Sequence, residues 1–314
     1  MTNTVTSGSI LLTGASGQVG GELVHTLAGL GEVIAPGRAE LDLSDESSVR
    51  AMVRRVQPRW IVNPAAYTAV DQAESEPELA YAINATAVKA LGEEAQAIGA
   101  AVLHFSTDYV FDGSKREPYV ESDPTAPTSV YGASKLAGEQ ELARSGAAHM
   151  IFRTSWVYGA TGKNFLRTIL KAARERERLR VVADQHGAPT WSRDLARMAA
   201  HVIGRCEERA AGAEPSGSLL DAVTQAGGVY HAAGAGETTW FGFAAEALRQ
   251  QRLQEPGVRL AEVDAIGTSE YPTPARRPEN SRMGCSRLAE TLGWRMMPWE
   301  RSLDAVLAEL GPAV

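Results

Sequence analysis

The sequence is poor in cysteine, with Cys206 and Cys285 as the only two thiols in 314 residues. Neither has a partner at the spacing of metal ligands, and two thiols cannot build the disulfide framework of a small secreted domain. The shortage argues against a disulfide-stabilised fold and against a structural zinc site. It is typical of a protein in a reducing compartment, so we expect a cytoplasmic location.

Long apolar runs and an excess of positive charge are also missing. No apolar run approaches the ~20 residues of a membrane-spanning helix, and residues 1–9 lack the basic-then-apolar pattern of a secretion signal. The formal net charge is −7, and the basic cluster at residues 174–178 alternates with glutamate, as a solvated helix face does. We therefore expect neither a membrane nor a nucleic acid as a partner.

Hydrophobic residues make up 44% of the chain, which is enough to bury a large core. In the first half, short apolar runs alternate with amphipathic stretches of helical length. The runs that predict strands are residues 10–12, 32–35, 60–63, 101–106 and 149–153. This alternation predicts an α/β protein with a Rossmann-type doubly wound parallel sheet, in which ligands bind beyond the carboxyl ends of the strands.

The alternation loosens after about Tyr158. We expect residues 1–158 to form a dinucleotide-binding domain, with sheet elements returning at about 179–230. Residues 159–178 and 231–314 are expected to form mainly a smaller, mixed substrate-binding lobe. Within the chain, residues 207–228 are rich in Ala, Gly and Ser and predict a loop, and Ser44 is a candidate cap for a helix over residues 45–56.

Three glycines, Gly14, Gly17 and Gly20, follow the first predicted strand and precede a predicted helix. Glycines there allow the backbone to approach a pyrophosphate, which then lies at the helix N-terminus. Glycines can also serve a tight turn that binds nothing. The strand before the loop and the helix after it favour a dinucleotide site.

Tyr131 and Lys135 are four residues apart, so a helix would carry both side chains on one face. A neighbouring ammonium favours the anion of a phenol and is expected to lower its pKa. Thr107, at the end of the fourth predicted strand, supplies a hydroxyl that could hold the same carbonyl oxygen. The set predicts movement of a hydride and a proton across a C–O bond, with Tyr131 as general acid or base.

The end of the second predicted strand bears on the choice of cofactor. A carboxylate at this place in dinucleotide folds binds the adenosine ribose, whereas an arginine accommodates a 2′-phosphate. This chain has Gly37 and Arg38 there, which predicts a preference for NADPH over NADH. The alternative is a solvated loop arginine, and Asp42 could still reach the adenosine.

Several motifs carry a resemblance to a known family, and they stand at residues 14–20, 63–74, 106–113, 131–139, 153–159, 184–190 and 271–278. With these motifs in this order, the chain resembles the extended short-chain dehydrogenase/reductases, and among them the dTDP-4-dehydrorhamnose reductases. The resemblance implies reduction of the C4 ketone of dTDP-4-dehydro-L-rhamnose to dTDP-L-rhamnose, with NADPH or NADH as cofactor.

The resemblance also implies roles for individual residues. Tyr131 would protonate the developing alkoxide, Thr107 would bond the same oxygen, and Lys135 would bind the nicotinamide ribose. The other implied cofactor contacts are Gly14, Gly17, Gln18, Val19, Asp42, Leu43, Ala65, Ala66 and Tyr67. The implied substrate contacts are Thr107, Asp108, Trp156, Arg276 and Arg277.

Some of these roles have structural alternatives. Trp156 could be a core aromatic, and a rigid proline-containing loop could simply expose Arg276 and Arg277. Adjacent arginines suit a diphosphate, however, because the guanidinium fork matches phosphate oxygens.

Other functions remain open. A nucleotide-sugar epimerase uses much the same Tyr/Lys pair, and a regulatory subunit resembling that of methionine adenosyltransferase shares the ancestry without catalysis. The family is associated in places with Mg²⁺ at a subunit interface, but no convincing carboxylate cluster stands out, so we assign no metal residues. We leave monomer and homodimer open.

Overall fold

The computed structural model describes residues 8–212 and 217–311. The strands are β1 (Ile10–Leu12), β2 (Val33–Ile34), β3 (Trp60–Asn63), β4 (Ala101–Thr107), β5 (His149–Thr154), β6 (Val157–Tyr158), β7 (Arg178–Val182), β8 (His186–Gly187), β9 (Thr190–Trp191), β10 (Gly228–His231), β11 (Thr238–Thr239) and β12 (Glu262–Ile266). The α-helices are α1 (Gln18–Leu27), α2 (Glu46–Val56), α3 (Val70–Ala73), α4 (Pro77–Tyr81), α5 (Ala87–Ile98), α6 (Val130–Arg144), α7 (Phe165–Glu175), α8 (Ser192–Gly212), α9 (Leu219–Gln225), α10 (Trp240–Gln254), α11 (Ser286–Leu292) and α12 (Trp299–Leu310). A π-helical segment, Ala82–Thr86, joins α4 to α5, and 3₁₀ turns form at Asp108–Val110 and Thr268–Glu270.

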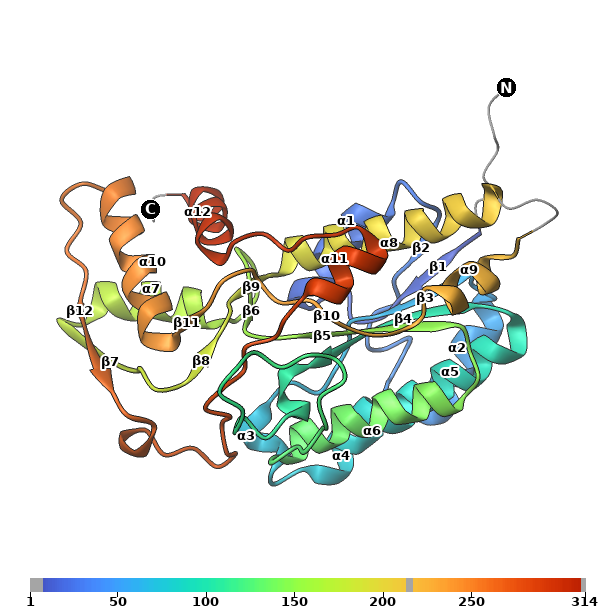
Figure 1. The fold of residues 1–314 in the computed structure, drawn as a ribbon, viewed down its shortest axis with the longest axis horizontal. Coiled ribbons are helices and arrows are strands. Elements are labelled where there is room, and N and C mark those ends of the chain that lie inside the picture. Colours follow the sequence, from blue (N-terminus) through green and yellow to red (C-terminus); the bar gives the residue numbers. More distant parts are fainter. Residues whose placement is uncertain (1–7, 213–216, 312–314) are drawn as a thin grey trace.

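The central sheet has six parallel strands in the order β10-β5-β4-β3-β1-β2 (Figure 1). The chain begins at β1 and adds β2 on one side and β3 on the other, so the direction of winding reverses beside β1. All five strands predicted from the first half of the chain belong to this sheet. The predicted doubly wound α/β fold is confirmed.

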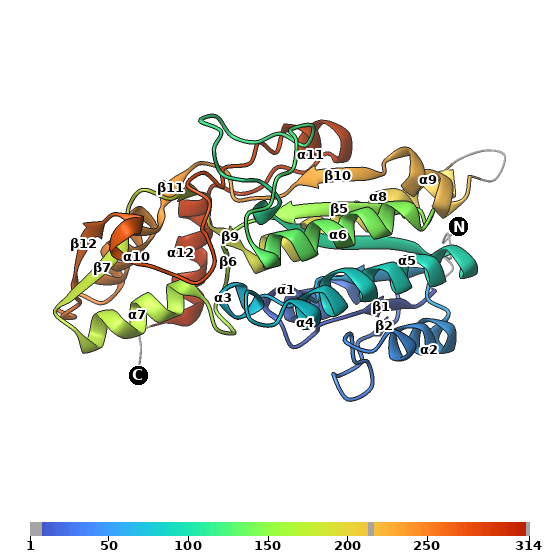
Figure 2. The ribbon, with the colours of Figure 1, turned by 90° about the horizontal axis from the view of Figure 1, so that it is seen from below.

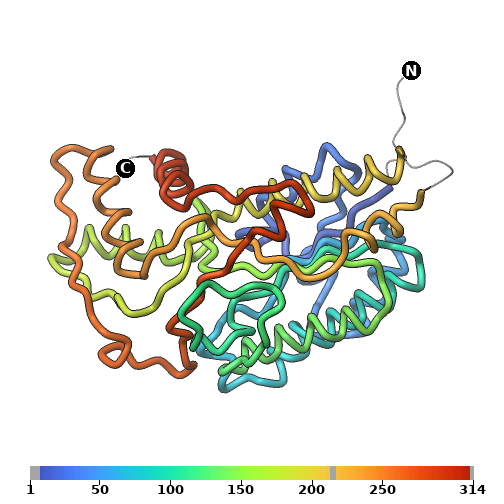
Figure 3. Tube along the Cα trace, in the orientation of Figure 1, coloured from blue at the N-terminus to red at the C-terminus, as the bar shows by residue number. Residues whose placement is uncertain are grey.

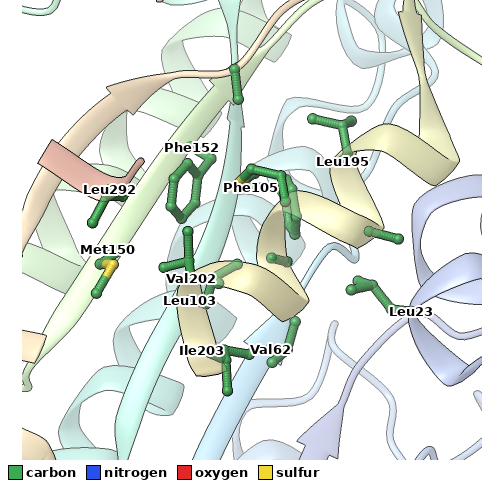
Figure 4. Packing of buried hydrophobic residues seen from close by; sticks show 14 of the residues in the cluster. Leu23, Val62, Leu103, Phe105, Met150, Phe152, Leu195, Val202, Ile203 and Leu292 are labelled. Atoms are coloured by element: carbon green, nitrogen blue, oxygen red, sulfur yellow. The ribbon is translucent and has the colours of Figure 1, made fainter. Parts of the chain in front are cut away.

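Helices cover both faces of the sheet because successive side chains of each strand point to opposite faces. Ile10 and Leu12 pack with α1 and α8, whereas Leu11 packs with α2 and α5. Figure 1 shows α1 and α8 above the sheet and α2, α5 and α6 below it. Figure 4 shows the upper layer, in which Leu195 and Val202 of α8 lie against the strands. Burial of each such side chain stabilises the fold by roughly 1.5–3 kcal/mol.

A second lobe has a hydrophobic core of its own. The helices α7, α10 and α12 surround it, with Phe243, Trp299 and Leu303 among its buried side chains. Figures 1 and 2 show these helices at one end of the molecule, together with the parallel pair β7 and β12. The chain passes repeatedly between the two lobes, as the trace in Figure 3 shows. The second lobe is therefore assembled from segments that are distant in the sequence.

We expected residues at about 179–230 to add strands to the central sheet, and the structure differs from this in part. Strand β10 lies in that range and pairs with β5, but β7 pairs with β12 in the second lobe. The alternation of exposed Arg178 and Arg180 with buried Leu179 and Val181 explains this. A strand inside a doubly wound sheet is covered on both faces and cannot expose every second residue.

Part of the 231–314 range also packs on the sheet rather than in the second lobe. Leu288 of α11 and Leu292, the last residue of that helix, are buried in the core cluster that α1 and α8 form with the central strands.

Two local expectations were wrong. Asp45, not Ser44, caps α2, because its carboxylate accepts the Ser47 amide, while Ser44 instead donates to Asp42. Part of the predicted loop at 207–228 is helical: α8 continues to Gly212, and Ser218 starts α9 with a capping box to Asp221.

Candidate active site

A cleft of about 890 Å³ runs along the carboxyl ends of the central strands. The loops after β1, β2 and β3 form its walls, together with the ends of β4 and β5 and the start of α6. The winding direction reverses beside β1, and ligands of doubly wound sheets bind at such a point. The residues expected to contact the cofactor all line this cleft: Gly14, Gly17, Gln18, Val19, Arg38, Asp42, Leu43, Ala65, Ala66, Tyr67, Tyr131 and Lys135.

The glycine loop is shaped by close contacts of its backbone. Gly14 has φ +60°, and a Cβ there would lie 2.8 Å from Cβ of Ala65. A Cβ at Gly20 would lie 2.0 Å from the Gly14 carbonyl oxygen. Helix α1 can therefore pack directly on the loop only with glycine at this position. The loop leads into the N-terminus of α1, where backbone amides are free to bind an anion.

The far end of the cleft carries charges of both signs. Arg38 is exposed, and Asp42 lies close enough for Arg38 to help lower the pKa of its carboxyl group. The larger cause of that lower pKa is the pair of bonds from Ser44, whose hydroxyl donates at 2.7 Å and whose amide donates at 2.9 Å. Glu40 accepts the Gly37 amide at 3.1 Å. Asp42 and Glu40 are thus held by the loop itself.

The loop after β3 is fixed to α6 through the π-helical segment. Asn84 in this segment accepts the Tyr67 amide at 2.8 Å and donates to Ser134 Oγ at 3.0 Å. The Tyr67 hydroxyl donates to Glu76 at 2.6 Å. Single π-helical turns are frequent at functional sites. Here the turn links one wall of the cleft to the helix that carries Tyr131.

Tyr131 and Lys135 lie in the first two turns of α6, and both are buried. Ser129 caps the helix by accepting the Gly132 amide at 3.1 Å. Thr107 ends β4 close enough to Tyr131 for its hydroxyl to act toward a lower pKa of the phenol. Burial is the larger effect, however, and it raises the pKa of Tyr131 above its usual value. The lower pKa that we expected from Lys135 is therefore not found, and Tyr131 holds its proton at neutral pH.

Lys135 is 1% exposed. Its Nζ donates to the Phe105 carbonyl at 2.7 Å and lies 3.2 Å from Nε2 of His104. Burial lowers the pKa of Lys135 to about 8, and the negative charge of Glu139 opposes this change. Near neutral pH the ammonium form still predominates.

Asp108 and Arg277 line the region next to Tyr131. The Thr107 hydroxyl donates to Asp108 Oδ1 at 2.9 Å, and burial raises the pKa of Asp108 to about 6. Arg277 pairs with Asp71 at 2.6 Å and donates to the Tyr109 hydroxyl at 3.3 Å. The Tyr109 ring meets the Tyr131 ring edge-on, with centroids 5.4 Å apart. The Tyr109 ring thus lies between Arg277 and Tyr131, whereas Arg276 is exposed.

Trp156 lies between the end of β5 and Val157, which lines the cleft. It has φ +47°, which is unusual for a bulky residue. Its ring stacks on Trp240 of the second lobe at 3.7 Å between centroids. Strained backbone near a cleft is often associated with function, but the stacking also gives Trp156 a packing role.

Some residues of the site went unnoticed in the sequence. Gly162 and Lys163 line the cleft from the segment between β6 and α7, and no motif pointed to them. Asn63 and His104, by contrast, are polar residues inside buried strands. A polar side chain within a buried apolar strand was the sequence feature that could have identified them as residues of the site.

Within residues 8–212 and 217–311, no group of three or more His, Cys, Asp or Glu side chains could hold a metal ion. None of the helices in this part of the chain is long and apolar enough to cross a membrane.

A family model and the sequences of known proteins match this chain over nearly its full length. The family model described as RmlD substrate binding domain matches residues 8–311. A dTDP-4-dehydrorhamnose reductase of Burkholderia thailandensis is 45% identical over 304 residues, covering 96% of this chain and 98% of the relative. The reductase of Escherichia coli K12 is 44% identical over 306 residues, with the same coverage of 96% and 98%.

Solved structures are similar as well. The dTDP-4-dehydrorhamnose reductase of Bacillus anthracis, in complex with NADP, has a TM-score of 0.84 and 34% identity, covering 97% of this chain and 100% of that chain. A UDP-glucose 4-epimerase of Thermus thermophilus, in complex with NAD, has a TM-score of 0.73 at 20% identity over 98% of this chain and 100% of that chain. The second likeness concerns the fold alone.

Fold and site together define a short-chain dehydrogenase/reductase, a class of nicotinamide-dependent oxidoreductases. The relatives narrow the class, because they match over nearly the full length of both chains. The chain belongs to the dTDP-4-dehydrorhamnose reductase family.

Proposed function

We propose that this protein reduces the C4 ketone of dTDP-4-dehydro-L-rhamnose to give dTDP-L-rhamnose. The observation that carries the proposal is that Tyr131 and Lys135 line the cleft, with Thr107 close enough to act on Tyr131, in a chain of this family. A buried phenol that keeps its proton at neutral pH is suited to protonate the oxygen of a ketone under reduction.

The cleft fits a nicotinamide dinucleotide. Its volume of about 890 Å³ and its position along the ends of the central strands suit an extended ligand. The absence of a Cβ at Gly14 and Gly17 leaves backbone at the surface where a pyrophosphate would be held, beside the N-terminus of α1. We assign the adenosine end to Asp42 and Leu43, the middle to Ala65, Ala66 and Tyr67, and the phosphates to Gly17, Gln18 and Val19. The reduced cofactor, when bound, supplies the hydride.

The proton comes from this chain. Tyr131 donates its hydroxyl proton to the carbonyl oxygen as negative charge develops there, and Lys135 stabilises the phenolate that remains. Thr107 donates a hydrogen bond to the same oxygen. Its hydroxyl points to Asp108 in the structure, so it turns from Asp108 to the substrate on binding.

The substrate contacts remain proposals. We assign Asp108, Trp156 and the Arg276-Arg277 pair to the nucleotide-sugar. Arg277 is held by Asp71 and Tyr109, which orients its guanidinium, whereas Arg276 is exposed and can turn toward a diphosphate.

For the cofactor we propose a preference for NADPH over NADH. Arg38 is exposed at the adenosine end of the cleft, and Gly37 brings no carboxylate to that position. Asp42 already accepts a hydrogen bond from Ser44, and Glu40 accepts one from the Gly37 amide. Both carboxylates are therefore less able to accept hydrogen bonds from the ribose hydroxyls of NADH. The two carboxylates nearby oppose a phosphate, so we expect a modest preference.

The test measures how much NADPH is oxidised for each molecule of sugar product. Purified protein is mixed with enzymatically prepared dTDP-4-dehydro-L-rhamnose and NADPH, nicotinamide oxidation is followed, and the sugar product is identified. We expect one NADPH oxidised for each dTDP-L-rhamnose formed. Isomerised sugar without net oxidation identifies an epimerase, and binding without turnover identifies a regulatory module. Either result overturns the proposal.

A further inference from the structure

A row of polar side chains crosses the face of the central sheet that packs on α5 and α6. Thr13 follows β1, Asn63 ends β3, and His104 lies opposite Asn63 in β4. Thr13 Oγ1 is 2.6 Å from Asn63 Oδ1, and Asn63 Nδ2 is 3.0 Å from His104 Nδ1. His104 Nε2 is 3.2 Å from Lys135 Nζ. The row thus begins at Thr13, which lines the cleft beside the glycine loop, and ends on the lysine of α6.

All four side chains are shielded from water, with exposures of 0% for Thr13, 2% for Asn63, 0% for His104 and 1% for Lys135. A buried polar group without a partner costs free energy, so each donor in the row must meet an acceptor. Burial, and secondarily the charge of Lys135, lower the pKa of His104 well below its usual value, so its imidazole is neutral. One ring nitrogen therefore donates and the other accepts.

The row has two consistent directions of hydrogen bonding. When Asn63 Nδ2 donates to His104, the imidazole proton is on Nε2 and faces Lys135, which must then be a neutral amine. When the Asn63 amide is turned by 180°, its oxygen accepts from Nδ1, and Nε2 becomes an acceptor for the Lys135 ammonium. The amide can then donate to Thr13 Oγ1.

We propose that Asn63 and His104 are positioning residues for Lys135. With the Asn63 amide turned, His104 Nε2 is a buried acceptor for the Lys135 ammonium, so the charge of Lys135 is tied to the direction of hydrogen bonding in the row. Two N–H groups of the ammonium are then used by Phe105 O and His104 Nε2, which leaves the third for the cleft. The inference rests on the proposed function, because the charge of Lys135 matters only if Tyr131 transfers a proton.

Other charged groups near the row act differently. Glu139, one turn further along α6, attracts the Lys135 charge, and His149 of β5 acts weakly on His104. Both are unchanged by substitution of His104. A shift in Lys135 titration on changing His104 therefore reports their contact.

The test uses the low lysine content of the chain. Its lysines are Lys89, Lys115, Lys135, Lys163 and Lys171. NMR of protein labelled at the lysine ε-carbon can resolve five signals. The signal that is lost in Lys135→Met is assigned to Lys135. We compare the titration midpoint of Lys135 in the parent, His104→Phe and His104→Gln. A lost hydrogen bond to a buried charge predicts a midpoint lower by about one unit in His104→Phe.

His104→Gln, whose amide oxygen can accept from Lys135, should restore most of the parent midpoint. His231→Phe is the matched control, because it replaces another fully buried histidine away from the row. It should leave the Lys135 midpoint unchanged. If thermal unfolding shows that His104→Phe is not folded, His104→Asn takes its place, because the shorter amide can bond Asn63 but not reach Lys135.

Kinetics complete the test. The alkaline limb of the pH profile for ketone reduction should move to lower pH in His104→Phe, in parallel with the Lys135 midpoint. An unchanged midpoint in that variant overturns the inference even if activity falls. If the midpoint moves but the parent does not reduce the sugar, the proposed function fails and the positioning role stands.

Discussion

At the scale of residues, burial decides how Tyr131 and Lys135 behave. It raises the pKa of the phenol and lowers the pKa of the ammonium to about 8, so the two values move apart. At neutral pH the phenol carries its proton and the lysine its charge, which is the state that a proton donor requires. The protonation states of the pair thus depend on the neighbours of α6 as much as on the helical spacing of the two residues.

Removal of the phenol oxygen tests the proton donor. Tyr131→Phe should lower turnover by ~10²–10⁴-fold, the usual contribution of positioned proton transfer, because no other acid is assigned to the ketone oxygen. The rest of the cleft wall is intact, so the affinity for NADPH and the melting temperature should change little. Turnover within a few-fold of the parent would remove Tyr131 from the mechanism.

The pH dependence follows from Lys135. Its pKa is about 8 in the folded protein against an ordinary value of 10.5, so reductase activity should decline as pH rises through about 8. Between these values the unfolded chain binds more protons than the folded one, so the contribution of Lys135 to stability rises with pH in that window. The difference in unfolding free energy between the parent and Lys135→Met, measured across this range, checks the sign. A difference that is flat or falls with pH contradicts it.

Arg38 tests the choice of cofactor. Arg38→Ala should reduce kcat/KM for NADPH roughly tenfold, since a charge-assisted contact to the 2′-phosphate is lost at an exposed site, and should affect NADH little. The comparison is kcat/KM with both cofactors for parent and variant. If the parent favours NADH, or if both cofactors are weakened equally, Arg38 does not read the 2′-phosphate.

At the scale of elements, periodicity determines what can be predicted. The central strands were visible as apolar runs, since both of their faces are buried. Strand β12 was not predicted because most of its residues are not buried, so it forms no apolar run. Helix α11 was not predicted because it is short and packs on the distant central sheet. The glycine loop and α6 were visible because their function requires fixed residue types at fixed spacing. Asn63 and His104 lie in predicted strands, but the contacts of His104 with Asn63 and with Lys135 depend on strand register and packing.

The packing of α1 on the glycine loop can be tested within one helix. In Gly20→Ala the new Cβ meets the Gly14 carbonyl oxygen at 2.0 Å, so the loop must shift. Strain of this kind should weaken NADPH binding on the order of ten- to a hundredfold. Gly21→Ala is the control, because its Cβ would lie at an ordinary 3.5 Å from the Ala15 carbonyl oxygen. Equal affinities of the two variants in a fluorescence titration would contradict the packing argument.

At the scale of the whole molecule, the site depends on contact between the lobes. Asn164 caps α7 in the second lobe and donates to Gln18 of the glycine loop at 3.0 Å, while Trp156 stacks on Trp240. The cofactor end of the site is local to strand ends and could be predicted from motifs. The proposed substrate contacts come from segments far apart in the chain, and Arg277, for example, is held by an ion pair with Asp71. Sequence spacing cannot reveal such pairs, so the assignment of the sugar contacts stays a prediction.

The central claim is that a hydride reaches C4 of the sugar while Tyr131 supplies the proton. The most direct measurement follows the isotope: NADPH deuterated at the transferred position is reacted with dTDP-4-dehydro-L-rhamnose in ordinary water, and the product is examined by NMR and mass spectrometry. We predict one deuterium per product molecule, at C4 and nowhere else, and a hydroxyl proton from the solvent pool. Product without deuterium at C4, or with the label at another carbon, contradicts the claim.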